Sequence, residues 1–377
     1  MRTRRAGGFD DVLSLRALNR ALLERQLLLR RSRRGILETV EHLVGLQAQA
    51  PQPPYIAMWS RLDDFRPEEL SQLLVDRQAV RIAVMRGTVH LVSARDCQRL
   101  RPVVQPIFDH DLTTNREHGI DPERIDITAL IKAARALLEE RPRSPKELGA
   151  LLAGCWPAFK PSSLAYAIRG QLALVQVPPR GLWGASGQTL HTTAEAWLGV
   201  EPGTDPSPDA MALRYLRAFG PASTMDLQAW SGLTGMSDVV ERLMPGLRSF
   251  RDENGRELLD VPDAPRPDPE TPAPARFIAE YDNLLVAHAD RRRIVSAADR
   301  RRTWVKNGAV PGTVLVDGFA AGTWRITRKS GTATLLVSAF QTLSHGDIEA
   351  VGEEGERLLR FVAADEAHDV RFVPAPQ

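Results

Sequence analysis

The chain has 377 residues, of which 43% are apolar and 25% are charged, and its formal net charge is +2. This length suggests two to four subdomains, and the near-neutral balance excludes a histone-like polycation. The charge is unevenly distributed, since residues 1–50 contain ten Arg and five acidic residues. Such an arginine bias either reflects a codon-biased genome or serves to bind phosphates through bidentate hydrogen bonds.

Several classes of protein are excluded by missing motifs. Cys97 and Cys155 are isolated, which argues against structural zinc, an iron–sulfur cluster and a disulfide framework. The sequence also lacks a phosphate-binding GxxxxGK[ST] motif, a metal-ligand cluster and a Ser/His/Asp constellation. No segment approaches the roughly 18 apolar residues of a membrane span, and the basic start is not followed by an apolar signal core. We therefore expect a cytoplasmic protein that uses no cofactor or metal and has no membrane partner.

The first predicted elements are helices followed by a β-hairpin. Ser32 is predicted to cap a helix that ends near Leu46, and a short helix follows around Tyr55–Arg61. Pro67 opens a further helix that runs toward Asp76. The hairpin consists of a strand over residues 80–85, a turn at Arg86-Gly87 and a strand over residues 88–94.

The same order of elements recurs twice. The second copy is predicted to contain helices at Ile127–Glu140, after Ser144 and at 161–171, then strands at Leu172–Val177 and Leu182–Trp183. The third is predicted to contain helices at Met211–Phe219, Ser223–Trp230 and Ser237–Leu243, then strands at Leu247–Arg251 and Glu257–Val261. Three helices and a hairpin form a winged helix, which docks one helix in a groove and lays its wing on the DNA backbone. Three such units in series make nucleic acid the leading partner, although winged helices also serve as protein–protein modules.

The sequence therefore predicts an α+β protein of three tandem winged-helix units with a β-rich C-terminal element. We place the units at residues 10–100, 101–205 and 206–262, a proline-rich linker at 263–275 and the C-terminal element at 276–377. Three antiparallel strands are expected in the last part, at Thr313–Val316, Thr323–Thr327 and Thr332–Ala339.

Two neutral amides, Gln47 and Gln49, stand where a helical pattern meets Pro51, Pro53 and Pro54. Side chains two positions apart share a face on extended chain, but point to nearly opposite sides of a helix. Pro51 biases the residue before it toward extended geometry, so the two amides can aim into one site. On residue type alone, a solvated surface is the commoner role for such a pair.

These residues, taken with others in order along the chain, resemble the AlkZ/YcaQ-like family of bacterial winged-helix DNA glycosylases. The resemblance spans roughly residues 13–345 and rests on residues 46–49, 85–92, 215–222, 281–285, 312–318 and 322–325. It implies a C-shaped arrangement with a DNA-sized cleft and the removal of bases that carry N-alkyl lesions. The family's motif is Gln–apolar–Gln or Gln–apolar–Asp, and Gln47, Ala48 and Gln49 fit the first form. This branch is similar to glycosylases that unhook interstrand crosslinks for antibiotic self-resistance, so Gln47 and Gln49 inherit the catalytic assignment.

Two amides suffice for a substrate that already carries positive charge. An N7-alkylated purine departs without a general acid, so the site must only place a water and stabilise an oxocarbenium-like state. Glutamine cannot deprotonate water as a carboxylate might, and we expect modest catalytic power. Cationic N7- or N3-alkylpurines should be excised, whereas uracil and oxidised neutral bases should not. Because a bulky crosslink cannot enter a snug base-flipping pocket, we expect an open cleft.

Other side chains are candidates for binding DNA. Thr88 and His90 share one face of the hairpin, and His90 either contacts the DNA or is a hydrogen-bonded structural residue. Arg86 at the first wing and Arg180 at the second are candidate phosphate or minor-groove contacts. His288 with Arg291 either faces DNA or lies on a solvated helix, while Asp282 and Asn283 are expected to satisfy local backbone groups in a turn.

We accordingly predict a monomeric, nucleoid-associated, monofunctional glycosylase that acts on alkylated or crosslinked double-stranded DNA. A lyase step is not expected, because the five lysines are scattered at Lys132, Lys146, Lys160, Lys306 and Lys329. The alternative is a non-catalytic transcriptional regulator built from the same modules. A regulator should prefer one DNA sequence, whereas the enzyme should tolerate many sequences and release free base.

Overall fold

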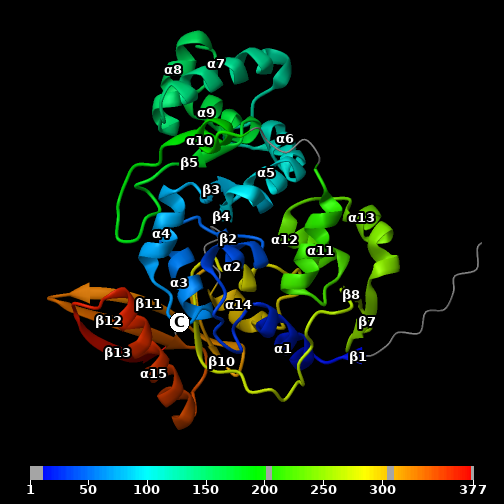
Figure 1. Ribbon diagram of the computed structural model, residues 1–377, viewed down its shortest axis with the longest axis vertical. Helices are drawn as coiled ribbons and strands as arrows, with labels where there is room; N and C mark the ends of the chain where they lie inside the picture. Colours follow the sequence, from blue (N-terminus) through cyan, green and yellow to red (C-terminus); the bar gives the residue numbers. More distant parts are fainter. Residues whose placement is uncertain (1–11, 201–205, 304–309, 375–377) are drawn as a thin grey trace, which may run out of the picture.

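The computed structural model describes residues 12–200, 206–303 and 310–374. Its strands form three sheets, ordered β1-β7-β8, β2-β4-β3-β5-β6 and β13-β12-β11-β10-β9. Helices pack against the first two sheets, and the third sheet lies beside the first unit (Figure 1). The predicted α+β class is confirmed.

The first unit contains the three helices that the sequence predicts and one more, α1, that it does not predict, and its wing joins a sheet. The helices before the wing are α1 (Leu15–Arg25), α2 (Ile36–His42), α3 (Pro53–Arg61) and α4 (Pro67–Val75). The wing is β3 (Ala79–Ala83), the 3₁₀ turn η1 (Met85–Gly87) and β4 (Val89–Ser93). Two short strands, β1 (Val12–Leu13) and β2 (Leu46–Gln47), complete this part.

The helix expected between Ser32 and Leu46 is shorter than predicted. α2 ends at His42, and Val44 and Gly45 then adopt left-handed backbone conformations, with φ of 55° and 88°. A Cβ on Gly45 would lie 2.8 Å from a Val92 methyl group, so only glycine allows this close approach. The turn directs Leu46 and Gln47 into a strand that pairs with β4.

In the second unit the helices are confirmed, but the second strand of the wing is not. The unit contains α7 (Ile127–Glu140), α8 (Pro145–Cys155), α9 (Pro161–Gln171), β5 (Leu174–Gln176), β6 (His191–Thr193) and α10 (Ala194–Leu198). Two helices that the sequence did not predict, α5 (Ala94–Val103) and α6 (Gln105–Thr114), come before α7, with the 3₁₀ turn η2 (Pro122–Arg124). This unit forms the upper part of the molecule in Figure 1.

The strand predicted at Leu182–Trp183 is wrong, because β5 pairs with β6 and residues 177–190 form a loop. This loop turns back onto the first unit instead of pairing with β5. The Tyr55 hydroxyl donates to the carbonyl oxygen of Gly181 at 2.7 Å, and the Trp183 ring lies 5.0 Å from that of Tyr55. Burial of an aromatic pair across two units outweighs local strand preference here.

The third unit follows the prediction closely. It contains α11 (Pro208–Phe219), α12 (Thr224–Ser231), α13 (Met236–Leu243), the 3₁₀ turn η3 (Met244–Gly246), β7 (Arg248–Asp252) and β8 (Glu257–Asp260). Ser223 and Asp226 form a capping box at the start of α12. Residues 262–275 contain no helix or strand.

The C-terminal element is larger than the three predicted strands. It contains β9 (Arg276–Ile278), η4 (Asn283–Leu285), α14 (Ala297–Thr303), β10 (Gly312–Val316), β11 (Phe319–Lys329), β12 (Thr332–Ala339), α15 (His345–Val362) and β13 (Ala367–Pro374). β13 pairs in parallel with β12 over eight registered positions, and α15 supplies the crossover between them.

The units predicted from the sequence are not structurally separate, because strands and ion pairs join them. β1 of the first unit pairs in parallel with β7 of the third, and Arg25 of α1 forms a buried ion pair with Asp260 of β8. The wings of the first and second units share one sheet through the β3–β5 pairing. The residue borders of the units therefore stay a prediction, although the order of helices and hairpins is the one expected.

Candidate active site

The Gln47–Gln49 segment is extended, and both amides reach the first wing. Gln47 pairs with His90 in the β2–β4 ladder, and the Ala48 backbone N–H donates to the carbonyl oxygen of Val89 at 2.7 Å. The Gln47 side-chain oxygen accepts a hydrogen bond from Arg86 Nη2 at 2.9 Å. The Gln49 side-chain oxygen accepts one from the Val89 backbone N–H at 3.3 Å. The two side chains therefore bind neighbouring parts of the same hairpin.

The orientation of both amides follows from these partners. Arginine and a backbone N–H can only donate, so the atom facing each of them must be the carbonyl oxygen, Oε1. Within the described residues, neither amide nitrogen donates to a protein group. Gln47 is half-buried and Gln49 is exposed. Both amides therefore have N–H groups, and a second lone pair on each oxygen, available to a bound molecule.

Arg86 holds the site together from inside the molecule. Its backbone has a φ of 55°, and its guanidinium donates to Trp230 O, to Gln47 Oε1 and to Asn283 Oδ1, the last two at 2.9 Å. The sequence predicted a DNA contact at this wing, but the structure directs the guanidinium toward the protein. Gly232 permits the approach, since a Cβ there would lie 2.8 Å from the Arg86 Cα.

The charge of Arg86 has no carboxylate partner among the described residues. Its hydrogen bonds to described residues go to neutral groups, including His90 Nε2 at 3.4 Å. Burial, reinforced by the nearby charge of Arg291, lowers the pKa of Arg86 to about 10, so the side chain stays protonated at neutral pH. The site therefore contains one positive charge that has no anionic partner among the described residues.

His90 is fully buried, so it is the hydrogen-bonded structural residue of the two alternatives. Its Nδ1 lies 2.9 Å from the Thr88 carbonyl oxygen, which can only accept, so Nδ1 carries the proton. Burial, with the charge of Arg86, lowers the pKa of His90 to about 3. The neutral ring leaves Nε2 as an acceptor toward Arg86. The Thr88 hydroxyl donates to the carbonyl oxygen of Met85 at 3.1 Å within the turn.

Asn283 completes the network through distant partners, and not through the local backbone groups of a turn that the sequence predicted for it. Its Oδ1 accepts from Arg86 and its Nδ2 donates to the Gly45 carbonyl oxygen at 3.2 Å. Its neighbour Asp282 caps Leu284 N as expected, and also forms a buried, two-pronged ion pair with Arg61. The only sequence signal for Asn283 was its place in the segment 281–285 shared with the glycosylase family.

His288 is not a DNA contact in this structure and does not lie on a solvated helix. Its side chain is 1% exposed, and its Nε2 lies 3.0 Å from the Phe219 carbonyl oxygen. Burial, with the charge of Arg293, lowers its pKa to about 3. The prediction is wrong because the chain after η4 crosses the core between the third unit and the C-terminal element. Arg291 is half-buried, donates to the His288 carbonyl oxygen and lies near enough to Arg86 to affect its pKa.

Arg81 of β3, also in the first wing, holds the backbone of the same segment. Arg81 Nη2 donates to the Ala48 carbonyl oxygen at 2.9 Å, and its buried charge lies near that of Arg180. Arg180 is half-buried and donates to the Gly187 carbonyl oxygen at 3.2 Å, so its role as a phosphate contact stays a prediction.

No metal or lysine chemistry is built into this network within the described residues. No group of three or more His, Cys, Asp or Glu in that part of the chain is placed to hold a metal ion. Lys132, Lys146, Lys160 and Lys329 are all exposed and lie outside the network, and Lys306 lies outside the described residues. In residues 12–200, 206–303 and 310–374, no helix is long and apolar enough to cross a membrane.

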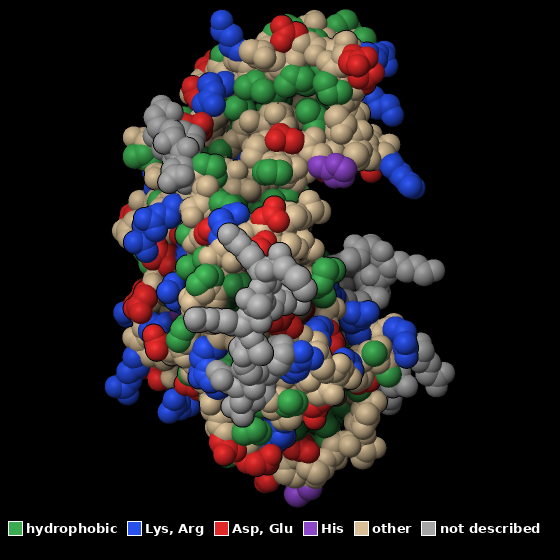
Figure 2. All heavy atoms as spheres, turned by 90° about the vertical axis from the view of Figure 1, so that its right-hand side faces the viewer, with side chains coloured by type: hydrophobic (Ala, Val, Ile, Leu, Met, Phe, Trp, Pro, Cys, Tyr) green, Lys and Arg blue, Asp and Glu red, His purple; other side chains and the backbone are tan. Residues whose placement is uncertain are grey.

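All four parts of the chain meet at the turn that carries Arg86. The third unit contributes Trp230 O, the C-terminal element contributes Asn283, and the second unit contributes Arg169, whose Nη2 donates to the Gly87 carbonyl oxygen at 2.7 Å. The surface is indented at one edge between its upper and lower parts (Figure 2). The candidate site is thus a junction and not the product of one unit.

Comparisons with known proteins agree with this architecture. A family model described as DNA glycosylase AlkZ-like matches residues 40–361. The chain is 23% identical to the interstrand DNA cross-link repair glycosylase of Streptomyces sahachiroi, over 90% of this chain and 94% of that protein. The solved structure of Streptomyces sahachiroi DNA glycosylase AlkZ covers 96% of this chain and 100% of its own, with a TM-score of 0.78 and 19% identity, and so shares the fold. From the extent of the family match, the chain belongs to the AlkZ-like family of DNA glycosylases.

Proposed function

We propose that this glycosylase hydrolyses the N-glycosidic bond of cationic N-alkylated purines, above all N7-alkylguanine, and leaves abasic sites. Gln47 and Gln49 are the proposed catalytic residues. The observation that carries the proposal is their arrangement on one extended segment, with both amide oxygens held by the first wing. No carboxylate belongs to the described network around Gln47, so a substrate that needs no general acid suits the site.

The two amides are suited to different tasks. The Gln47 oxygen is bound by a guanidinium, which withdraws electron density and leaves it a weaker acceptor for a water. The Gln49 oxygen is bound only by a neutral backbone N–H at 3.3 Å and is exposed. We therefore assign the water and the developing positive charge on the sugar to Gln49. Gln47, with its N–H groups free, is assigned the orientation of the nucleotide.

Interstrand crosslinks are proposed as substrates alongside monoadducts. The name of the Streptomyces sahachiroi relative states cross-link repair, and the exposed position of Gln49 favours a lesion that is attacked without entering a closed pocket. Double-stranded alkylated or crosslinked DNA is the proposed partner, bound by a monomer in the cytoplasm at the nucleoid. Arg180 and Arg291 are the proposed phosphate contacts, with Thr88 at the wing. The DNA glycosylase family favours this enzyme over the regulator that the winged-helix modules alone also permit.

A gel assay tests the proposal. Duplexes that carry one N7-methylguanine or one interstrand N7-guanine crosslink are incubated with the protein and then treated with alkali to reveal abasic sites. Gln49→Ala should lower the rate by on the order of a hundredfold to ten-thousandfold, the range of a positioned proton acceptor. Gln47→Ala should lower it less.

Gln78→Ala is the matched control, because Gln78 is an exposed glutamine in the connection between α4 and β3. It should leave excision, folding and DNA affinity unchanged. Undiminished excision by Gln49→Ala would refute the assignment, and efficient release of uracil from a duplex would refute the substrate class.

A further inference from the structure

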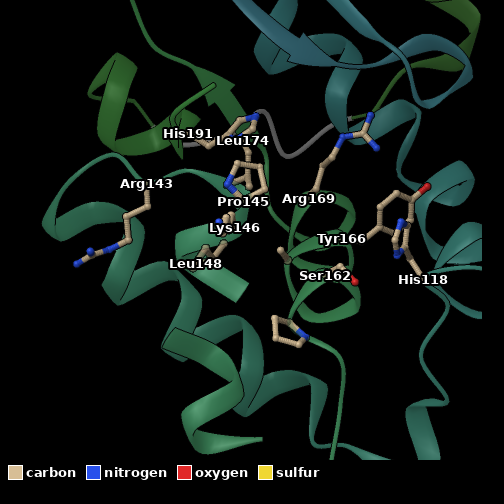
Figure 3. A pocket seen from close by; sticks show the side chains of 12 residues that line it. His118, Arg143, Pro145, Lys146, Leu148, Ser162, Tyr166, Arg169, Leu174 and His191 are labelled. Atoms are coloured by element: carbon tan, nitrogen blue, oxygen red, sulfur yellow. The ribbon is translucent and has the colours of Figure 1, made fainter. Parts of the chain in front are cut away.

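A separate cavity of about 600 Å³ lies in the second unit, between α8, α9 and the strands β5 and β6. Figure 3 shows His191 and Leu174 on one side of this space and Tyr166 and His118 on the other. One of its lining residues, Arg169, also donates to the Gly87 carbonyl oxygen beside the Gln47 network, and the other lining residues lie outside that network. The volume lies within the range of small-molecule sites in proteins.

The walls of the cavity are largely apolar. Pro145 and Leu148 of α8, Pro161 and Ala165 of α9, and Leu174 of β5 line it. Flat proline rings and aliphatic side chains of this kind favour a planar apolar body over a flexible polar one. Tyr166 adds an aromatic face. Its hydroxyl group donates to Asp111 at 2.5 Å and therefore cannot also donate to a ligand.

His191 is a buried polar group without a partner. Its side chain lines the cavity and is 9% exposed, yet neither ring nitrogen has a hydrogen bond to a described residue. Burial, with the charge of Arg169, lowers its pKa to about 4, so the ring is neutral at pH 7 and offers one donor and one acceptor. These two ring nitrogens are therefore available to hydrogen-bond a bound molecule.

The charges around the cavity are of one sign. Its lining contains Lys146, Arg169 and Arg143 but no carboxylate. Arg143 is neutralised by Glu140 and Glu147 and points away from the space (Figure 3). Lys146 and Arg169 have no ion pair with a described carboxylate. The positive ends of α8 and α9, which begin at Pro145 and Pro161, border the same space.

We propose that this cavity binds a small planar anion, such as an aromatic carboxylate, sulfonate or phosphate. The ring system lies between the apolar walls, the anionic group meets Lys146 and Arg169, and His191 supplies a hydrogen bond. The site is distinct from the proposed catalytic glutamines and stands whether or not they carry out the reaction. Arg169 also holds Gly87 of the first wing, so Lys146 is the better position for a test.

Isothermal titration calorimetry of the full-length protein with two probes tests this site. Biphenyl-4-carboxylate and biphenyl-4-carboxamide have nearly the same shape and differ in charge. The carboxylate should bind at least about tenfold more tightly, as expected for a hydrogen bond to a charged group. Lys146→Met should reduce that difference by weakening the carboxylate alone, since Arg169 still faces the anionic group. Leu148→Trp should fill the cavity and abolish binding of both probes.

Lys132→Met is the matched control, since Lys132 is an exposed lysine on α7 of the same unit. It should change neither affinity, and the melting temperature should show that each variant is folded. Equal affinity for the two probes, absence of saturable binding, or an equal effect of Lys132→Met would overturn the proposal. It is also overturned if undamaged duplex DNA displaces the carboxylate and Lys146→Met weakens both ligands equally, because the cavity then belongs to the DNA surface.

Discussion

The wings of the first and second units lie in one sheet but do different work. The first has a three-residue turn, η1, whose Arg86 side chain binds Gln47, the third unit and the C-terminal element. The second has the long connection 177–190, which contacts the first unit mainly through its backbone and Trp183. A tight turn can hold one side chain at a fixed position, whereas a long loop can pack over a larger surface of the neighbouring unit. The same supersecondary unit therefore positions chemistry in one copy and braces the scaffold in the other.

Substitution of Arg86 in the first wing should have the largest effect on the rate of excision. Arg86→Met removes the donor that orients Gln47, and a misplacement of about 1 Å can cost on the order of a hundredfold in rate. Excision of N7-methylguanine under single-turnover conditions measures the loss, and circular dichroism verifies folding. Arg86→Lys keeps the charge but lacks the planar fork, so it should recover little of the rate. Wild-type excision by Arg86→Met would show that Gln47 does not depend on this contact.

Each of the two wings contains a buried, neutral histidine, so lowering the pH should reduce the free energy of unfolding through both. The pKa of His90 is about 3 and that of His191 about 4, so in the folded protein both stay neutral at pH 5. The unfolded chain binds protons below about pH 6.5, so stability is present above that pH and is lost as pH falls toward the folded pKa. Each histidine should remove roughly 2 kcal/mol of unfolding free energy between pH 7 and pH 5.

Urea unfolding at the two pH values measures this loss. His191→Phe should reduce the difference between them by roughly the share of one histidine. An unchanged difference in this variant would mean that His191 is protonated or exposed in the folded protein.

Loss of the Asn283 side chain, which links the C-terminal element to the first wing, should lower the rate of excision less than loss of the Arg86 side chain. Asn283→Ala deletes one acceptor of Arg86 and one donor to Gly45, while Gln47 keeps its own bond to Arg86. We expect excision to fall about tenfold, the equivalent of one hydrogen bond to a charged group. Asn254→Ala, at an exposed asparagine of the third unit, is the control and should have wild-type activity. An Asn283→Ala enzyme as fast as wild type would remove Asn283 from the positioning role.

A substitution that removes a contact of the second wing should lower the stability of the protein more than its excision activity. Tyr55→Phe removes the hydroxyl that donates to the Gly181 carbonyl oxygen but keeps the ring against Trp183. The free energy of unfolding should fall by about 1 kcal/mol, with excision within about twofold of wild type. A large loss of excision with normal stability would contradict the division of roles between the two wings.

Much of the local structure could be predicted from the residues. Proline at the first turn correctly located α4 and α9, and serine correctly located the starts of α8 and α12, because such signals act within one turn of the chain. Elements that depend on distant partners were missed. β6 pairs with β5 only after a long loop, and β13 reaches β12 in parallel after the α15 crossover. Such pairings leave little trace in a local pattern.

By itself the sequence determined that Gln47 and Gln49 lie on an extended segment beside prolines, since backbone restriction is local. It also determined the series of helices and hairpins, through periodicity and caps. Only the tertiary structure decided which way the amides point, because Arg86, Asn283 and Trp230 come from three distant parts of the chain. It likewise decided that His90 and His288 are buried, since the burial of a polar residue depends on neighbours that sequence spacing does not specify.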